Sequence, residues 1–258
     1  MEEVVTVEAV APHIVMVTIR RLRARNAING AVAMALDRAV KTIEGDSDIW
    51  AAVLTGEGDQ VFCAGADLKE IAAGRLPSLL TPDGGFAGFV YHPRDKLWIA
   101  AIEGLAVAGG FEIALACDLR VATEESAFAL PEVTRGLAAA AGGIFRLPRE
   151  LPRVLALELI ATGERLPAAR AAELGLLNCL VPKGQARTAA ITLAQQICAN
   201  APLAVRESLK IARRALDLDD QDLRKLADEA QDFLATTLDF AEGPHAFIER
   251  RPPRWQGR

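Results

Sequence analysis

The sequence predicts an α/β fold whose second half is mostly helical. Short apolar runs with the density of strands alternate with segments of helical period up to about residue 195. Beyond residue 152, most predicted segments are helices. The composition agrees with a folded chain, because 51% of the 258 residues are hydrophobic and only 24% are charged.

The predicted elements of the first hundred residues follow from these patterns. IVMVTI at 14–19 is rich in β-branched residues, as strands are, and apolar residues recur at helical spacing between 32 and 43. IWAAVLT at 49–55 has the pattern of a buried strand, and a short helix is expected at 66–73. Glycine and proline are frequent in 74–96, which predicts a long, mobile loop.

The remaining elements lead to a division of the chain. Further strands are expected at 98–102, 119–123 and 176–181, and helices at 109–116, 152–161, 167–174, 184–199, 202–215 and 219–240, with another helix opened by Gly142 and Gly143. Strands separated by helices predict parallel sheets covered by helices. We therefore expect an α/β core at 1–195 and a helical domain at 196–258.

The charge balance and the cysteines exclude several classes of protein. Acidic residues outnumber basic ones by 34 to 29, which argues against a nucleic-acid binder but leaves room for a local basic pocket. The opening MEEVVTVEAV lacks the basic and apolar regions of a signal peptide. Four cysteines lie far apart, as free thiols of a reducing compartment do, so we expect a cytoplasmic protein.

The most apolar run, Trp98 to Cys117, is close to the length of a membrane span. Glu103 and Glu112 lie within it, and each acidic residue at a bilayer centre costs roughly 2.5–3.5 kcal/mol. Three glycines interrupt it further. We interpret the run as a buried strand, a glycine turn and a buried helix, and expect no membrane association.

Several common chemistries have no support in the sequence. It contains neither a phosphate-binding GxxxxGK[ST] loop nor a GxSxG nucleophile elbow. Gly56-Glu57-Gly58 follows a strand but lacks the third small residue of a dinucleotide fingerprint. The three histidines, His13, His92 and His245, show no ligand spacing, so we expect no metal site.

Two glycine-containing motifs are more specific. FCAGADLKE at 62–70 and GLAVAGGFE at 104–112 each place small residues where a helix begins. Backbone N–H groups at such a point are unpaired and suit an anion or a developing oxyanion. The alternative is two helix starts packed tightly against a sheet.

Two glutamates accompany these motifs. Glu112 lies one helical turn into the second motif, and Glu132 follows in the apolar turn FALPEV. If the strand between them returns the chain, the carboxylates meet in an apolar site, and their repulsion gives one acid and one base near neutral pH. The alternatives are a paired core acid at 112 and a solvated turn residue at 132.

At these residues the chain resembles the crotonase family, also called the enoyl-CoA hydratase/isomerase family. The matching segments are FCAGADLKE (62–70), AIEGLAVAGGFEIALACDLRVAT (101–123), FALPEVTRG (128–136), GGIFRLPRELP (142–152) and ATGERLPAARAAELGLLN (161–178). The resemblance extends from about residue 4 to the C-terminus. The LPE turn, the loop at 84–89 and the tail at 242–258 most resemble the carnitinyl-CoA dehydratase branch.

The resemblance implies a spiral of ββα turns with a C-terminal helical trimerisation domain, in a homotrimer or a hexamer. It implies an acyl-CoA substrate, with coenzyme A as part of that substrate and no permanently bound cofactor. By motif position, Ala66 and Gly109 would form the oxyanion hole, and Glu112 and Glu132 would catalyse hydration of an enoyl-CoA. The positions that would bind CoA or substrate are Arg23, Arg25, Ala27, Ala64, Asp67, Leu68, Lys69, Gly110, Pro131, Phe247 and Arg250.

The sequence departs from the family at two places. Leu22 replaces a common proline, and Leu137 to Ala141 replace the usual proline and polar residues near the expected acyl chain. An alanine-lined wall favours an apolar acyl group over a trimethylammonium group, for which Phe86, Phe89 and Tyr91 are the aromatic candidates. Crotonobetainyl-CoA hydration, double-bond isomerisation and a non-catalytic RNA-binding role remain alternatives.

Overall fold

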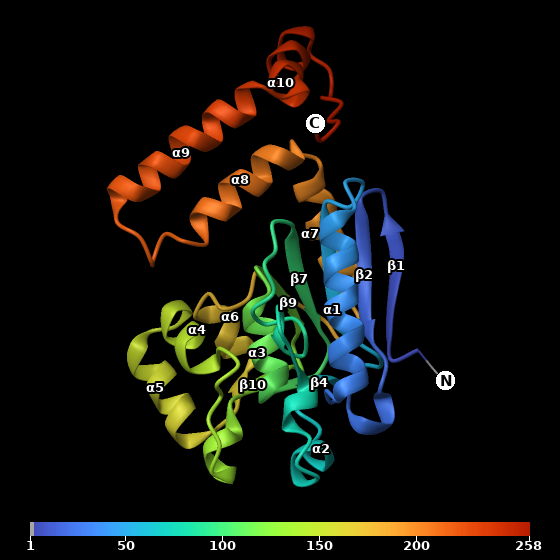
Figure 1. Ribbon diagram of the computed structural model, residues 1–258, viewed down its shortest axis with the longest axis vertical. Helices are drawn as coiled ribbons and strands as arrows, with labels where there is room; N and C mark the ends of the chain where they lie inside the picture. Colours follow the sequence, from blue (N-terminus) through green and yellow to red (C-terminus); the bar gives the residue numbers. More distant parts are fainter. Residues whose placement is uncertain (1–2) are drawn as a thin grey trace.

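The computed structural model describes residues 3–258, so the first two residues of the segment analysed for a signal peptide lie outside the described residues. Within this range the largest sheet has six strands in the order β1-β2-β3-β7-β9-β12 (Figure 1). These are β1 (Val5–Ala11), β2 (Ile14–Ile19), β3 (Ala51–Gly56), β7 (Leu97–Ile102), β9 (Leu119–Thr123) and β12 (Cys179–Val181). Within this sheet only β1 and β2 pair antiparallel, and the other neighbouring strands are parallel. The expected parallel sheet is therefore present.

A second sheet has the order β11-β10-β8-β4. Its strands are β11 (Leu166–Pro167), β10 (Ala127–Ala129), β8 (Leu105–Val107) and β4 (Val61–Cys63). Strands β4, β8 and β10 run parallel, so their carboxyl ends lie along one edge. The sequence-based prediction missed β8, β10 and β11.

Helices cover both sheets and form the end of the chain. They are α1 (Gly30–Gly45), α2 (Leu68–Ala72), α3 (Gly109–Ala116), α4 (Gly143–Glu150), α5 (Arg153–Thr162), α6 (Ala168–Glu173), α7 (Ala186–Cys198), α8 (Pro202–Ala212), α9 (Asp220–Ala235) and α10 (Leu238–Glu249). The single helix expected at 219–240 is wrong. It is divided at Thr237, whose side chain accepts a hydrogen bond from the Phe240 N–H and so caps a new helix.

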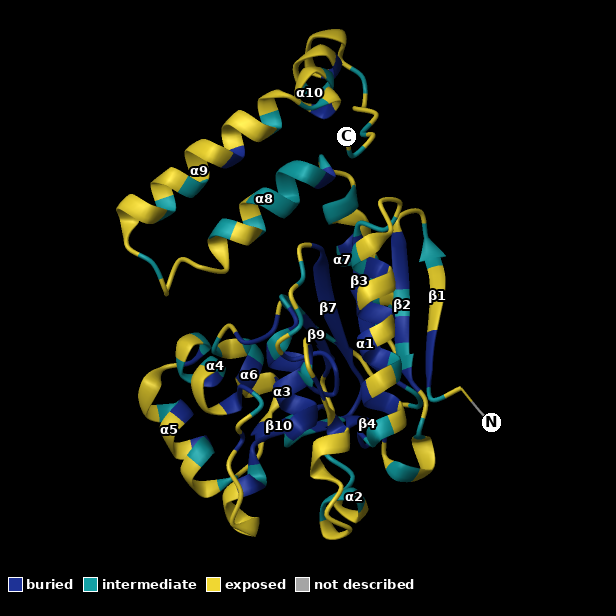
Figure 2. Cartoon of the chain, in the orientation of Figure 1, coloured by how far each residue is buried: buried dark blue, intermediate teal, exposed yellow. Residues whose placement is uncertain are grey.

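The central strands β3 and β7 of the six-stranded sheet are buried on both faces. Apolar side chains of α1 fill one face, whereas Ala186, Ala190 and Ala194 of α7 pack on the other against Val53 and Ile99 (Figure 2). The apolar run from Trp98 to Cys117 forms the expected strand, β7, and the expected helix, α3, with the short strand β8 between them, and is part of this core. None of the helices in residues 3–258 is both long and apolar enough to cross a membrane.

The segment at 74–96 is anchored, in contrast to the mobile loop that we expected. It contains a short 3₁₀ helix, η2 (Leu76–Leu79), and a hairpin of β5 (Leu80–Thr81) and β6 (Gly85–Phe86). Phe86, Phe89 and Val90 are buried in the core. These apolar side chains hold the segment down although its glycines and prolines exclude long regular elements.

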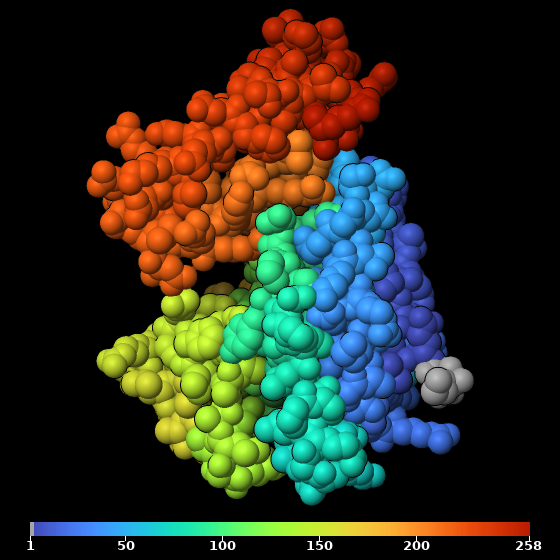
Figure 3. Space-filling model, in the orientation of Figure 1, coloured from blue at the N-terminus to red at the C-terminus, as the bar shows by residue number. Residues whose placement is uncertain are grey.

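The C-terminal helices stand apart from the sheets. Helices α8, α9 and α10 extend away from the body, and Figure 3 shows a hollow between them and the part of the chain that contains α4 and α5. The predicted domain boundary at 195 falls inside α7, which packs on the large sheet. The division into two domains stays a prediction.

Candidate active site

The short parallel strands bring the two glycine-containing motifs together. Register pairs Val61 with Leu105 and Cys63 with Ala106, and Phe128 lies beside Ala106 on the other side. The residues that follow β4, β8 and β10 therefore emerge at one edge of the sheet. They include Ala66, Gly109 and Glu132.

Glycine allows the two motif backbones to touch. Gly65 has φ +85°, and a Cβ there would lie 2.8 Å from the Gly109 nitrogen. A Cβ on Gly110 would lie 2.0 Å from the Cys63 carbonyl oxygen. No larger residue fits either position without moving backbone.

Two backbone donors are left free at this contact. Within residues 3–258, the N–H groups of Ala66 and Gly109 donate no hydrogen bond. Ala108, at the start of α3, has the unusual backbone angles φ 52° and ψ −134°, and its carbonyl accepts from Phe111 and Glu112. The turn therefore aims the Gly109 N–H away from the helix, as an oxyanion site requires.

Glu112 is 4% exposed, on the first turn of α3. Its Oε1 accepts a hydrogen bond of 2.9 Å from the Gly143 N–H at the start of α4. Burial, and less strongly the nearby charge of Glu132, raise its pKa to about 7 against the lowering effect of the Gly143 hydrogen bond.

Glu132 is held by η3 (Pro131–Arg135), the 3₁₀ helix that follows β10. It is 9% exposed, and its Oε2 is buried without a hydrogen-bond partner in the described chain. Burial raises its pKa as well. A buried carboxylate oxygen without a partner is costly, which favours a role in binding or proton transfer over the solvated turn that was the alternative.

A turn at 21–28 supports the first motif from its other side. Ile28 bridges Ala66, since its N–H donates to Gly65 and its carbonyl accepts from Asp67. Arg21 donates to the Ala27 carbonyl and pairs with the Asp67 carboxylate, which also caps α2. Sequence reasoning missed Arg21, although it lies in the basic run that precedes the turn.

The predicted CoA-binding residues around this turn share one region. Arg23 lies in η1 (Leu22–Ala24) and lines a cavity of about 510 Å³ together with Arg20, Arg21 and Glu57. The Arg25 carbonyl accepts from the Ala64 N–H, and Leu68 and Lys69 are exposed at the start of α2. Gly110 lies two residues before Glu112, and Pro131 lies directly before Glu132.

Two predicted residues are not brought to this site within one chain. Phe247 is 86% exposed on α10, and Arg250 follows as its C-terminal cap. Both lie in the C-terminal helical part, at the end of the molecule opposite α2 (Figure 1). Their expected contact with CoA requires a second copy of the chain and stays a prediction.

Comparison with known proteins decides the family. The family model described as enoyl-CoA hydratase/isomerase matches residues 10–258. The chain belongs to the enoyl-CoA hydratase/isomerase family. This confirms the resemblance to the crotonase family. The expectation of a hydro-lyase enzyme is confirmed as well, since the relatives of this chain are named hydratases and dehydratases.

Individual relatives show how close the match is. A carnitinyl-CoA dehydratase from Salmonella typhi is 37% identical over 250 residues, which cover 95% of each chain. The crystal structure of an enoyl-CoA hydratase from Mycobacterium tuberculosis superposes with a TM-score of 0.95 at 44% identity over the whole of both chains. A carnitinyl-CoA hydratase from Mycobacterium avium gives a TM-score of 0.79 at 43% identity, again over both whole chains. The chain therefore has the crotonase fold.

Proposed function

We propose that this protein adds water to, or removes it from, the 2,3 double bond of an acyl-CoA thioester. The thioester oxygen accepts hydrogen bonds from the N–H groups of Ala66 and Gly109, which draws electrons from the β-carbon. A water between Glu112 and Glu132 forms the new carbon–oxygen bond and gives its proton to the ionised carboxylate. The protonated carboxyl delivers a proton to the α-carbon. Dehydration is the same sequence reversed.

One observation carries this proposal above others on the same fold. Two buried carboxyl groups, one with a pKa near neutrality and one with an unpartnered oxygen, lie beside two free backbone donors. Hydration needs a base, an acid and an oxyanion site together. A shift of a double bond needs only one carboxyl group to move a proton.

The direct test is the product formed from crotonyl-CoA and water. We expect loss of the conjugated double bond and formation of 3-hydroxybutyryl-CoA. Isomerisation of a 3-enoyl-CoA without hydration would favour the isomerase alternative, and salt-dependent RNA binding without either activity would favour the non-catalytic one.

The reaction should depend on pH through the glutamate pair. Catalysis needs the pair to hold one proton, and burial raises the pKa of Glu112 to about 7. As pH rises through this value the pair loses its last proton, so kcat/KM should fall by about tenfold per pH unit above it. A profile measured with crotonyl-CoA checks this, with circular dichroism at each pH as the control for folding. A kcat/KM that increases from neutral to alkaline pH would contradict the assignment.

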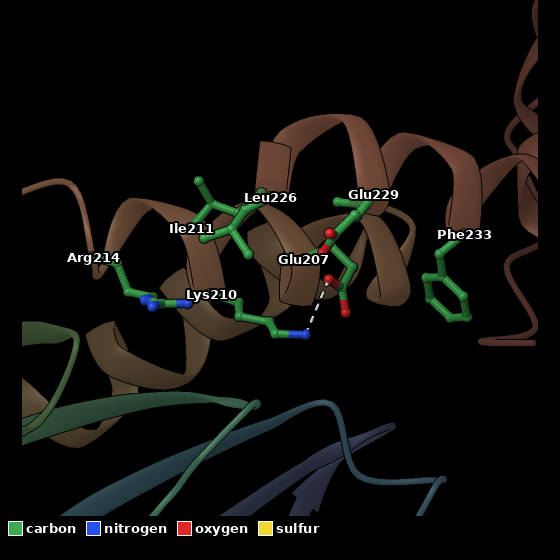
Figure 4. Close-up of a pocket in the computed structure, with 8 residues that line it drawn as sticks. Glu207, Lys210, Ile211, Arg214, Leu226, Glu229 and Phe233 are labelled. Carbon is green, nitrogen blue, oxygen red and sulfur yellow. Dashed lines mark hydrogen bonds and ion pairs between the residues drawn. The ribbon is translucent and has the colours of Figure 1, made fainter. Parts of the chain in front are cut away.

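The C-terminal helices fit the proposed homotrimer or hexamer. Between α8 and α9 lies a groove of about 330 Å³, lined by half-buried Ile211 and Leu226, by exposed Phe233, and by the charged residues Glu207, Lys210, Arg214 and Glu229 (Figure 4). Phe247 and Ile248 are also largely exposed, on α10. The exposed side chains of Phe233, Phe247 and Ile248 favour burial against other copies of the chain.

A second candidate is hydration of a trimethylammonium substrate, as in the carnitinyl-CoA dehydratase branch. The 37% identity to the Salmonella typhi enzyme favours it. The choice between an apolar and a trimethylammonium acyl group depends on the residues expected near the acyl chain, which are those at 137–141 and the aromatic candidates Phe86, Phe89 and Tyr91.

A further inference from the structure

The backbone at the start of α3 is strained. Ala108 has φ 52° and ψ −134°, a combination with positive φ that residues with a Cβ rarely adopt. This conformation orients the peptide that joins Ala108 to Gly109, and the N–H of that peptide is one of the two proposed oxyanion donors. Strain of this kind persists only where the surrounding structure holds it.

Hydrogen bonds hold one end of this peptide. The Ala108 N–H donates to the Ala129 carbonyl at the end of β10, at 2.9 Å. The Ala108 carbonyl accepts from the N–H groups of Phe111 and Glu112. In the described chain the Gly109 N–H donates no hydrogen bond. The N–H end of the peptide is therefore held by packing.

The ring of Phe86 supplies much of that packing. The three heavy atoms nearest to a Cβ built on Gly109 all belong to this ring, and the closest, Cε1, would lie at 2.4 Å. Gly65 of the first motif approaches as well, since its own Cβ would lie 2.8 Å from the Gly109 nitrogen. Gly109 is thus enclosed by Phe86 and by the first motif, which leaves its peptide little room to rotate.

The hairpin that carries Phe86 is docked on α1. Gly88 has φ +65°, and a Cβ there would lie 2.3 Å from the Ala33 carbonyl oxygen, so the backbone of the segment touches the helix. The buried Thr81 hydroxyl donates to Oδ1 of Asp37, also buried, at 2.7 Å. Phe86 is therefore fixed to the body of the protein through α1, independently of α3.

We propose that Phe86 is a positioning residue, whose ring holds the strained Ala108–Gly109 peptide so that the Gly109 N–H points at the thioester oxygen. This rests on the proposed function, which assigns that N–H to the oxyanion. Without the ring, the peptide rotates to relieve Ala108 and the donor turns away from the oxygen. Glycine at position 108 adopts positive φ without strain, so it should restore the orientation that loss of the ring removes.

Steady-state kinetics with crotonyl-CoA gives the first test. Phe86→Ala should lower kcat by about 10- to 100-fold with little change in KM, because a displaced donor weakens the transition state more than it weakens substrate binding. Adding Ala108→Gly to Phe86→Ala should recover most of the lost kcat. Mere loss of packing at Phe86 would not be repaired in this way, since glycine adds no contact.

Ile43→Ala provides the control for lost packing. Ile43 is fully buried near the end of α1, so this variant also shortens a large core side chain to alanine. Circular dichroism identifies a temperature at which all variants are folded, and kcat is compared there. Ile43→Ala should unfold at a lower temperature than wild type, keep its kcat when folded, and gain no kcat from Ala108→Gly.

Thermal unfolding tests the strain without any substrate. Ala108→Gly should raise the unfolding temperature of the wild-type protein by about 2–4 °C, because it removes the strain. Beside Phe86→Ala the increase should be clearly smaller, since the peptide has already relaxed. Equal increases in the two backgrounds, or undiminished kcat of folded Phe86→Ala, would overturn the inference.

The two readouts separate this inference from the proposed function. If crotonyl-CoA is not hydrated but the two increases in unfolding temperature differ as expected, the proposed function fails and the role of Phe86 in holding the peptide stands. If wild type hydrates crotonyl-CoA and Phe86→Ala does so equally well, only the inference about Phe86 fails.

Discussion

Replacing Glu132 with glutamine is expected to lower kcat/KM for hydration of crotonyl-CoA by about 10²- to 10⁴-fold. Glu132 lies in an apolar site with one buried, unpartnered carboxylate oxygen, and the amide that replaces it has nearly the same shape but cannot take or deliver a proton. Steady-state kinetics with crotonyl-CoA measures the loss. It should appear in kcat, because the lost interaction acts in the transition state.

The nearby Glu124 offers a control for this substitution. It is exposed in the connection between β9 and β10, so Glu124→Gln should leave kcat/KM unchanged. Burial raises the pKa of Glu132, which means that its ionised form is disfavoured in the fold. Glu132→Gln should therefore unfold at no lower temperature than wild type at neutral pH. Undiminished hydration by this folded variant would refute the two-glutamate mechanism.

Replacing Gly65 with alanine is expected to lower kcat by about 10²- to 10³-fold, as removal of an oxyanion donor does. The new methyl group would lie 2.8 Å from the Gly109 nitrogen and 2.9 Å from the Ala108 Cβ. Both atoms lie at the start of α3, so the two motifs must move apart. The Ala66 and Gly109 N–H groups then no longer converge on one oxygen.

Gly74→Ala separates this effect from backbone strain. Gly74 has φ +73°, close to the φ +85° of Gly65, but a Cβ there meets no atom within 4 Å. Both variants lose roughly 1 kcal/mol of stability from the left-handed backbone. Only Gly65→Ala should lose activity, as measured by crotonyl-CoA kinetics beside thermal unfolding. Equal losses of kcat in the two variants would show that the contact between the motifs does not matter for catalysis.

The long elements of the fold could be predicted from local pattern. The strand at 119–123 and the helix at 109–116 have the expected bounds, because each carries enough apolar residues to show its period. Strands β4, β8 and β10 have three residues each and show no period. They exist because they pair with one another, which is information that no short window of sequence contains.

The site residues also divide into those that a local motif predicts and those that depend on contacts between distant parts of the chain. Ala66, Gly109, Glu112 and Glu132 were predicted from motif position, and their roles in catalysis stay proposals. Gly143 and Arg21 were missed because each contacts a residue that lies far away in sequence: Glu112 is 31 positions before Gly143, and Asp67 is 46 positions after Arg21. Hydrogen-bond partners at that separation leave no spacing signal.

The sequence by itself determined the fold class, the helical end of the chain and the residue types that carry the proposed chemistry. These properties depend on local composition and on periodicity, which are fully present in the chain. The tertiary structure decided which carboxylate lacks a partner and which N–H groups remain free. The physical reason is that burial and pairing of a polar group depend on every segment packed around it, and three parallel strands from distant parts of the chain set that packing here.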